Sequence, residues 1–306
     1  MTQSNSKKNW EDIYYTSRDG LRLHARHYPV KGSGRRPVLC LPGLTRNAKD
    51  FHVIASYLND PERHRRDVYV LDYRGRGLSQ HDTDWRNYSP YLEMLDVLDF
   101  MAMKQLHDVA IIGTSRGGLI AMIMGTLRPT SIGAVVMNDI GPEIESEGLM
   151  RIIGYVGKIP VPVDWAEATE LTKRINQRDF PKISDQEWGE FARQIFNDEN
   201  GAPSASYDPQ LSQAITMLDP EADIPDMWPQ FDALKNIPVM AIRGENSDIL
   251  SAKTLDKMKD HHPNLKTLIV PDQGHAPLLR DNPTIEEIAH FLIEADGIKR
   301  SDISHG

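Results

Sequence analysis

Short apolar runs recur along this chain and are separated by segments with helical periodicity. The clearest helical pattern covers Tyr91–Leu106, and two others cover Leu119–Leu127 and Ile285–Ile293. Strands that alternate with helices predict a mostly parallel sheet with helices on both faces. We interpret six apolar runs as buried parallel strands: Val38–Leu41, Val68–Leu71, Val109–Ile112, Ile132–Met137, Val239–Ile242 and Leu265–Val270.

A hairpin precedes these runs. Ile13–Ser17 and Leu21–Tyr28 alternate apolar and polar residues on either side of the turn Arg18-Asp19-Gly20. Two antiparallel strands added to the six runs predict an eight-stranded, mostly parallel sheet.

The chain has 306 residues, enough for one large domain that carries an insertion. Residues 143–229 interrupt the alternation because they contain helical stretches and no convincing buried strand. We therefore expect a core formed by residues 10–142 and 230–298, with 143–229 inserted as a helical cap. The tails, 1–9 and 299–306, are expected to be loose.

Charge and cysteine content restrict the partners and the compartment. A net charge of -9 argues against binding to nucleic acid, which requires a basic surface. Cys40 is the only cysteine, and residues 1–10 have no apolar run typical of a signal peptide. The strongly apolar run Leu119–Met124 is too short to cross a membrane. We expect a cytoplasmic protein with no membrane association, and the sequence leaves its oligomeric state open.

Known cofactor motifs are missing from the sequence. It has no phosphate-binding G-x-x-x-x-G-K-[ST] loop, no H-E-x-x-H and no C-x-x-C. His81, Asp82 and Asp84 are more simply explained as part of a polar loop than as metal ligands. We therefore expect no cofactor and no metal.

The run Val109–Ile112 leads directly into Gly113-Thr114-Ser115-Arg116-Gly117 and then into an apolar helix. This is a G-x-S-x-G pattern in a strand–turn–helix context, which presents the serine hydroxyl on a sharp turn. The flanking glycines are required because a Cβ there would collide with a neighbouring strand or helix. Ser115 is therefore the candidate nucleophile.

A serine hydroxyl needs a base to remove its proton. Among the 11 histidines, only His275 lies on a loop between the last expected strand and the last expected helix. That loop places an imidazole over the carboxyl edge of the sheet, so His275 is the candidate general base.

The imidazole in turn needs a carboxylate that orients it and stabilises its protonated form. Asp248 follows the run Val239–Ile242, and the order Ser115, Asp248, His275 is the one expected for this architecture. We favour Asp248 and retain two alternatives: Glu245 on the same loop, and Asp139 at the end of the strand after the nucleophile.

Two backbone N–H groups are candidates for stabilising a tetrahedral oxyanion. One belongs to Arg116, which follows the nucleophile and begins a helix whose dipole favours negative charge. The other belongs to Leu44, in the loop Leu41-Pro42-Gly43-Leu44-Thr45.

Taken together, these motifs resemble the α/β-hydrolase superfamily over residues 13–293. The resemblance rests on Pro42-Gly43-Leu44, on Asp72-Tyr73-Arg74-Gly75-Arg76-Gly77-Leu78-Ser79 as a D-x-R-G-x-G-x-S loop, on Ser115, on Asp248 and on Gly274-His275. It implies the branch of small-molecule esterases, lactonases and carbon–carbon bond hydrolases with a helical cap. Pro42 departs from the usual histidine and removes a side chain that often braces this loop. Epoxide hydrolases and haloalkane dehalogenases share the fold but use an aspartate nucleophile, which Ser115 argues against.

The substrate is less defined by the sequence. Arg46 and the Arg116 side chain are candidates for pairing with a substrate carboxylate, with structural ion pairs as the alternative. Trp165, Trp188 and Met217 are candidates for lining an acyl pocket, with ordinary packing as the alternative. The leading hypothesis is hydrolysis of a small carboxylic ester or lactone. Hydrolysis of a carbon–carbon bond in a ring-cleavage product, and a ligand sensor with slow turnover, are the alternatives.

Overall fold

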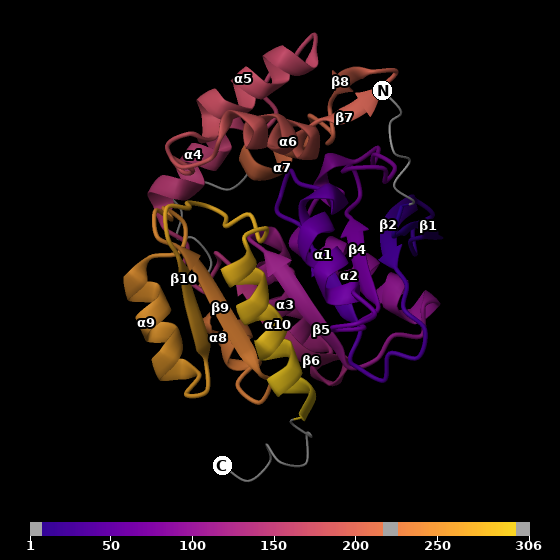
Figure 1. The fold of residues 1–306 in the computed structure, drawn as a ribbon, viewed down its shortest axis with the longest axis vertical. Helices are drawn as coiled ribbons and strands as arrows, with labels where there is room; N and C mark the ends of the chain where they lie inside the picture. Colours follow the sequence, from indigo (N-terminus) through magenta and orange to yellow (C-terminus); the bar gives the residue numbers. More distant parts are fainter. Residues whose placement is uncertain (1–7, 217–225, 298–306) are drawn as a thin grey trace.

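The computed structural model of the protein describes residues 8–216 and 226–297. An eight-stranded sheet runs through it in the order β1-β2-β4-β3-β5-β6-β9-β10 (Figure 1). Its first two pairings, β1 with β2 and β2 with β4, are antiparallel, and the remaining ones are parallel. The predicted sheet is thus confirmed. Its strands are β1 (Glu11–Thr16), β2 (Arg22–Tyr28), β3 (Val38–Leu41), β4 (Val68–Asp72), β5 (Val109–Thr114), β6 (Ile132–Asn138), β9 (Val239–Gly244) and β10 (Lys266–Val270).

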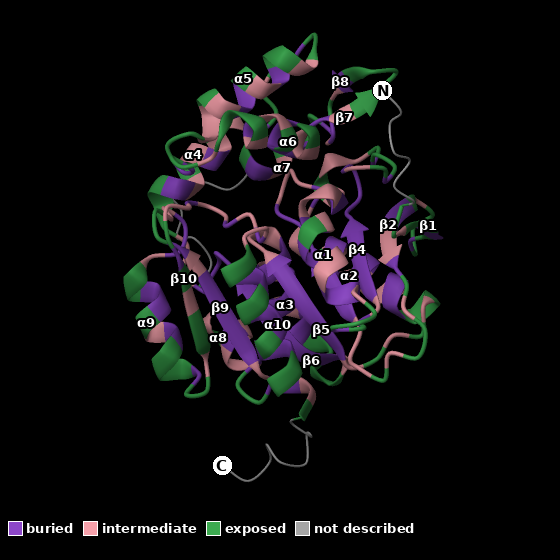
Figure 2. Ribbon diagram, viewed as in Figure 1, coloured by how far each residue is buried: buried purple, intermediate pink, exposed green. Residues whose placement is uncertain are grey.

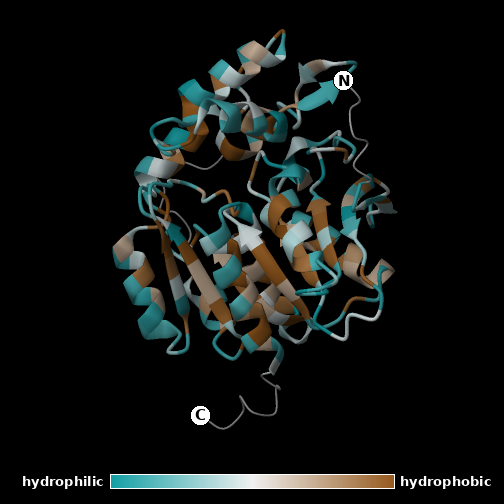
Figure 3. Ribbon diagram, in the orientation of Figure 1, coloured by the Kyte–Doolittle hydropathy of each residue, from teal (hydrophilic) through white to brown (hydrophobic). Residues whose placement is uncertain are grey.

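Helices cover both faces of the sheet because alternate residues of the central strands point to opposite sides. Leu39 and Ile111, which pair across β3 and β5, belong to the core under one helical layer. Cys40 and Ile112, the next pair, belong to the core under the other layer. Figure 2 shows the central strands as a buried sheet, and Figure 3 shows the same strands as the most hydrophobic part of the molecule.

One layer contains α1 (His52–Asn59) and α10 (Asn282–Gly297). The other contains α2 (Pro90–Met103), α3 (Arg116–Leu127), α8 (Trp228–Asp232) and α9 (Ala252–His261). Short 3-10 helices occur at Ala48–Phe51, Trp85–Asn87 and Pro129–Ser131.

The elements between β6 and α8 lie together beyond the carboxyl edge of the sheet (Figure 1). We call them the cap: α4 (Ser146–Tyr155), α5 (Trp165–Asn176), α6 (Asp185–Ile195), β7 (Asn197–Glu199), β8 (Ala202–Ser204) and α7 (Leu211–Thr216). The short hairpin of β7 and β8 adds strands to a segment expected to be helical. The expected boundary at residue 229 falls inside α8, whose Phe231 is buried in the core beneath the sheet.

Polar contacts fasten the cap to the loops of the core. Arg151 of α4 donates two hydrogen bonds to Asp248, at 2.6 and 2.7 Å. Near the other end of the cap, Asn47 donates to the carbonyl of Gln194 at 3.0 Å, and Lys49 donates to the carbonyl of Phe196. These bonds satisfy carbonyls at the end of α6, which have no partner within the helix.

Residues 1–7 and 298–306 lie outside the described residues, so the expectation for the tails is not tested there. Within the two described ranges, no helix combines the length and the apolar character needed to span a bilayer.

The glycines of the serine turn allow β5 and α3 to pack closely. A Cβ on Gly117 would lie 2.1 Å from the carbonyl oxygen of Leu41 in β3, and a Cβ on Gly113 would lie 2.5 Å from the carbonyl carbon of Gly117. Both contacts are with backbone, which cannot move aside without shifting a strand. The expectation that these positions require glycine is therefore consistent with the packing.

Gly117→Ala is expected to lower the free energy of unfolding by about 2–3 kcal/mol, because its methyl group would overlap the β3 backbone. Gly154→Ala in α4 is the matched control: its Cβ would meet nothing within 4 Å. Alanine favours the helix there by up to about 1 kcal/mol. Urea denaturation of both variants measures the difference, and equal effects would contradict the packing argument.

Lys49 is expected to make stability depend on pH. Burial lowers the pKa of Lys49 to about 8 from an ordinary value of 10.5. Between these two values the unfolded chain binds more protons at Lys49, so this residue makes the free energy of unfolding increase with pH. Urea denaturation at about pH 7.5 and about pH 9.5 should show a larger increase for the native protein than for Lys49→Met. Replacement of the exposed Lys235 by Met should leave the native increase intact, and a variant at Lys49 that also retained it would refute the assignment.

Candidate active site

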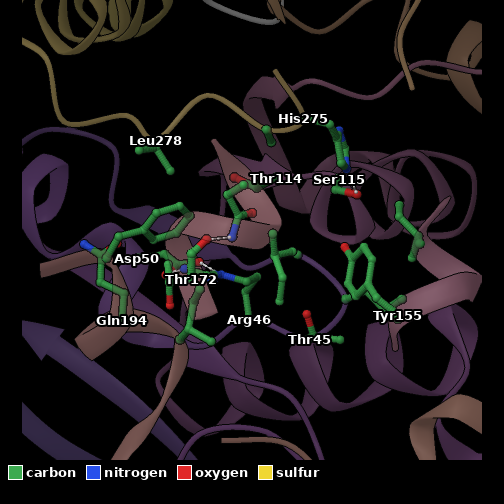
Figure 4. A pocket seen from close by; sticks show the side chains of 18 of the residues that line it. Thr45, Arg46, Asp50, Thr114, Ser115, Tyr155, Thr172, Gln194, His275 and Leu278 are labelled. Carbon is green, nitrogen blue, oxygen red and sulfur yellow. Dashed lines mark hydrogen bonds and ion pairs between the residues drawn. The ribbon is translucent and has the colours of Figure 1, made fainter. Parts of the chain in front are cut away.

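Ser115 lies at the turn between β5 and α3, with φ 49° and ψ -109°. A positive φ is uncommon for a residue with a side chain, and such strain concentrates at functional sites. The backbone N–H of Ser115 donates to the carbonyl of Asn138 in the adjacent strand β6, at 2.9 Å. The turn is therefore held against β6, and Ser115 lines the pocket drawn in Figure 4.

His275 lies on the loop after β10 and reaches Ser115. Its Nε2 is 2.9 Å from Ser115 Oγ, and the two side chains face each other in Figure 4. Asn138 Nδ2 donates to the carbonyl of Pro277 at 2.9 Å, which ties the histidine loop to β6. The two residues that the sequence selected from distant segments are thus in hydrogen-bond contact.

The carboxylate bonded to His275 belongs to Asp139, directly after β6. His275 Nδ1 is 2.8 Å from Asp139 Oδ2. Asp139 also accepts from the backbone N–H of Gly244 at 2.8 Å and from the hydroxyl of Ser247 at 2.6 Å. Its side chain is fully buried. A buried carboxylate with three donors around it is well satisfied and fixed in position.

The prediction that Asp248 is the carboxylate bonded to His275 is wrong in this structure. Both Asp248 oxygens accept from Arg151 of the cap. Burial alone would raise the pKa of Asp248, but the hydrogen bonds and charge of Arg151 hold that pKa below its ordinary value. Arg151 Nη1 also lies 3.5 Å from Asp179 Oδ2. Because Arg151 pairs with both carboxylates, Asp248 belongs to an ion-pair cluster between core and cap.

The end of β9 and the loop after it still contribute to the site, through Gly244 and Ser247 instead of Asp248. The other alternative, Glu245, accepts from the backbone N–H of Asp272. The sequence signal for Asp139 was its place at the end of β6, the strand that pairs with β5. Adjacent parallel strands end close together, so a carboxylate there starts beside the nucleophile.

The two candidate oxyanion donors belong to residues near Ser115, one next to it in the chain and one on the loop after β3. Arg116 is the first residue of α3, whose initial N–H groups have no partner within the helix. Leu44 lines the same cavity as Ser115, and a Cβ on Gly43 would lie 3.9 Å from the Cβ of Ser115. The Arg116 side chain, a candidate for pairing with a substrate carboxylate, is instead bonded to the protein: its Nε donates to the buried carboxylate of Glu93 at 2.7 Å.

A cavity of about 150 Å³ opens above Ser115 and His275, between the core loops and the cap. Most of its lining is apolar. The cap contributes Ile152, Tyr155, Val156, Ile159, Leu171, Ile175, Phe191 and Ile195, and polar groups come from Thr172, Asn176 and Gln194.

Arg46 also lines this cavity, and its Nε and Nη2 are bonded to Asp50 at 2.7 and 2.6 Å. Its guanidinium lies 5.1 Å from the ring centre of Phe191 in the cap. Trp165 and Trp188 are not among the lining residues within the described ranges. Trp165 donates to the carbonyl of Gly201, and Trp188 is buried against Phe191, behind the lining. Met217 lies outside the described residues.

The described residues contain no group of three or more His, Cys, Asp or Glu side chains arranged to hold a metal ion.

Comparison with known proteins gives a consistent family assignment. Residues 38–287 match the model of the alpha/beta hydrolase family. A 3-hydroxybutyrate-oligomer hydrolase of Cupriavidus necator is 29% identical over 283 residues, which is 90% of this chain and 94% of that protein. An N-formylmaleamate deformylase of Pseudomonas putida is 25% identical, over 85% of this chain and 88% of the relative.

Solved structures extend this similarity to the fold. The crystal structure of an alpha/beta hydrolase from Novosphingobium aromaticivorans shares 38% identity with a TM-score of 0.86, covering 94% of this chain and 99% of that one. With the family model spanning most of the chain, the protein belongs to the alpha/beta hydrolase family.

Proposed function

We propose that this protein hydrolyses a small carboxylic ester or lactone through an acyl-enzyme on Ser115. The observation that carries the proposal is the continuous hydrogen-bond chain from Ser115 Oγ to His275 and on to Asp139, with distances of 2.9 and 2.8 Å. Its serine end lines a mostly apolar cavity. A nucleophile, a base and a buried carboxylate in this order are what acyl transfer requires.

In the first half-reaction, Ser115 Oγ attacks the ester carbonyl carbon while His275 Nε2 takes the hydroxyl proton. The carbonyl oxygen becomes an oxyanion, which the N–H groups of Leu44 and Arg116 are proposed to stabilise. Asp139 holds the imidazole through Nδ1 and stabilises its positive charge. The C–O bond to the leaving group then breaks, and His275 returns the proton to the departing alcohol oxygen.

In the second half-reaction, a water molecule replaces the alcohol. His275 removes a proton from the water as its oxygen attacks the acyl carbon, and a second oxyanion forms in the same place. Collapse of this intermediate returns the proton to Ser115 Oγ and releases the carboxylic acid. Both halves use the same three side chains, so no further catalytic group is required.

The size of the cavity favours a substrate with a short acyl group. A cavity of about 150 Å³ is large enough for a ligand of benzene size. Asp50 makes the Arg46–Asp50 pair formally neutral, so we place a hydroxyl or carbonyl of the substrate beside this pair in preference to a lone carboxylate. The relative named as a 3-hydroxybutyrate-oligomer hydrolase makes a short 3-hydroxyacyl ester the first natural candidate.

Turnover of p-nitrophenyl butyrate tests the proposed reaction. The native protein should release p-nitrophenol with an initial burst, as an acyl-enzyme forms faster than it is hydrolysed. Ser115→Ala should lose at least about a thousandfold in kcat, because the nucleophile is removed. Butyrolactone and a 3-hydroxybutyrate dimer, assayed in parallel, rank lactone against ester. Ester turnover that survives Ser115→Ala would refute the proposal.

The identity of the acid is tested by two isosteric changes. Asp139→Asn is expected to lower kcat by about 10³- to 10⁴-fold, because an amide favours the wrong imidazole tautomer. Asp248→Asn should lower kcat by less than about tenfold, since its carboxylate is bonded to Arg151 and contributes mainly to cap attachment. Thermal unfolding of both variants confirms that each is folded. The opposite ranking of kcat would assign the acid to Asp248.

A further inference from the structure

A set of buried charged groups connects the start of α3, next to Ser115, with the loop after β3. At its centre is Glu93 of α2, whose side chain has no exposed surface. One oxygen of Glu93 accepts from Arg116 Nε at 2.7 Å, and the other lies 2.8 Å from Arg76 Nη2. The single carboxylate therefore binds two guanidinium groups from different parts of the chain.

The first arm ends at the start of α3. Arg116 follows Ser115 directly, and its Nη2 also donates to the carbonyl of Tyr88 at 2.9 Å. Two bonds from one planar guanidinium fix both its position and its orientation. The backbone of Arg116, with the N–H proposed for the oxyanion, is attached to this anchored side chain.

The second arm ends at the loop after β3. Arg76 Nε donates to the carbonyl of Leu44 at 2.9 Å, and Arg76 Nη1 donates to the carbonyl of Arg74 at 2.7 Å. In the same loop, the carbonyl of Gly43 accepts from the N–H of Arg46 at 3.1 Å. The N–H and C=O of a trans peptide point in opposite directions, so a fixed Gly43 carbonyl fixes the direction of the Leu44 N–H. Arg76 binds the carbonyl of the next peptide, between Leu44 and Thr45, and so restrains the orientation of the loop.

A second buried arginine nearby provides a contrast. Arg74 is bonded to three carboxylates, those of Asp19, Asp82 and Asp96, at 2.7–2.8 Å. These acceptors lie outside the lining of the catalytic cavity. Glu93, in contrast, is a single carboxylate that pairs with two arginines. One of these, Arg116, is itself next to Ser115, and the other, Arg76, is bonded to Leu44 in the loop after β3. Burial raises the pKa of Glu93, but the charges of Arg116 and Arg76 outweigh it and hold that pKa below its ordinary value.

We propose that Glu93 is a positioning residue that holds the backbone N–H groups of Leu44 and Arg116 in place through Arg76 and Arg116. This inference rests on the proposed function, because it concerns the donors to an oxyanion. Donors held in advance need no reorganisation when the charge forms, which is the source of their large effect on rate.

The test compares binding of a tetrahedral adduct with binding of a planar ligand. Butylboronic acid forms a tetrahedral adduct on a nucleophilic serine, whereas butyrate, the product acid, remains planar. In Glu93→Gln, kcat/KM for p-nitrophenyl butyrate and boronate affinity should both fall by about 10- to 100-fold. KM and butyrate affinity should change by less than about threefold, because only interactions specific to the transition state are lost.

A second variant, Arg76→Met, tests the same proposal if Glu93→Gln does not fold. In Arg76→Met the negative charge of Glu93 is still balanced by the positive charge of Arg116. The Leu44 carbonyl, however, loses its hydrogen bond from Arg76. The variant should weaken boronate binding about tenfold or more, with butyrate affinity little changed. The matched control is Arg36→Met. Arg36, like Arg76, combines ion pairing with a hydrogen bond to a backbone carbonyl: it pairs with Asp108 at 2.8 Å and Asp296 at 3.7 Å and donates to the carbonyl of Ala295 at 2.8 Å. It lies before β3, at the opposite end of the sheet. Its variant should keep the native boronate affinity even if it is less stable.

A folded Glu93→Gln that binds the boronate within about twofold of the native protein would overturn the positioning role. If Glu93→Gln does not fold, the same result for Arg76→Met would overturn it. Either outcome leaves the proposed function intact, provided that ester turnover still depends on Ser115. Native turnover that does not depend on Ser115 would instead refute the proposed function itself.

Discussion

The candidate site depends on one buried carboxylate, that of Asp139. It is placed at the end of β6, where it accepts from Gly244, Ser247 and His275. These donors come from the end of β9, from the loop after it and from the loop after β10, so one side chain joins three consecutive strand ends of the sheet. An ionised group without partners in this position would be very costly, because burial removes its water. The surrounding loops must therefore close around Asp139 in one geometry, and that geometry directs His275 towards Ser115.

A second buried carboxylate at the carboxyl edge of the sheet, that of Asp72, is also surrounded by hydrogen-bond donors. Asp72 ends β4 and accepts from the backbone N–H groups of Ala48 and Leu78, with His24 on the same side chain. A Cβ on Gly77 would lie 2.1 Å from its carboxylate, so the loop after β4 can close over Asp72 only with glycine there. Buried ion pairs contribute little net stability when desolvation is counted, but removal of one partner is strongly unfavourable. Such groups thus restrict the loops to a few arrangements, which is what a site built from loops needs.

The sequence predicted the sheet, and it selected Ser115 and His275, which the structure brings into contact, because each of these features leaves a local pattern. Apolar runs of strand length, a glycine-flanked serine between a strand and a helix, and a histidine on the last loop can all be read from short windows. The candidate acid has no such pattern. Asp139 and Asp248 both follow strands, but Asp139 is bonded to His275, whereas Asp248 is bonded to Arg151, a residue of the inserted segment about a hundred positions away in sequence. The contact that decides the outcome is a tertiary one, between cap and core.

The cavity lining was the least predictable part for a related reason. Trp165 and Trp188 are large and apolar, which suits them to a pocket and to a small core alike. In the structure Trp188 packs with Phe180 and Phe191 inside the cap, while Tyr155 and Ile152 of α4 line the same cavity as Ser115. Hydrophobic periodicity identifies the buried face of a helix but does not distinguish a face buried against protein from one that borders a cavity. The core loops thus hold Ser115 and His275, which can be recognised in sequence. In the proposed reaction the cap lining sets which acyl groups fit, through packing that only the folded arrangement reveals.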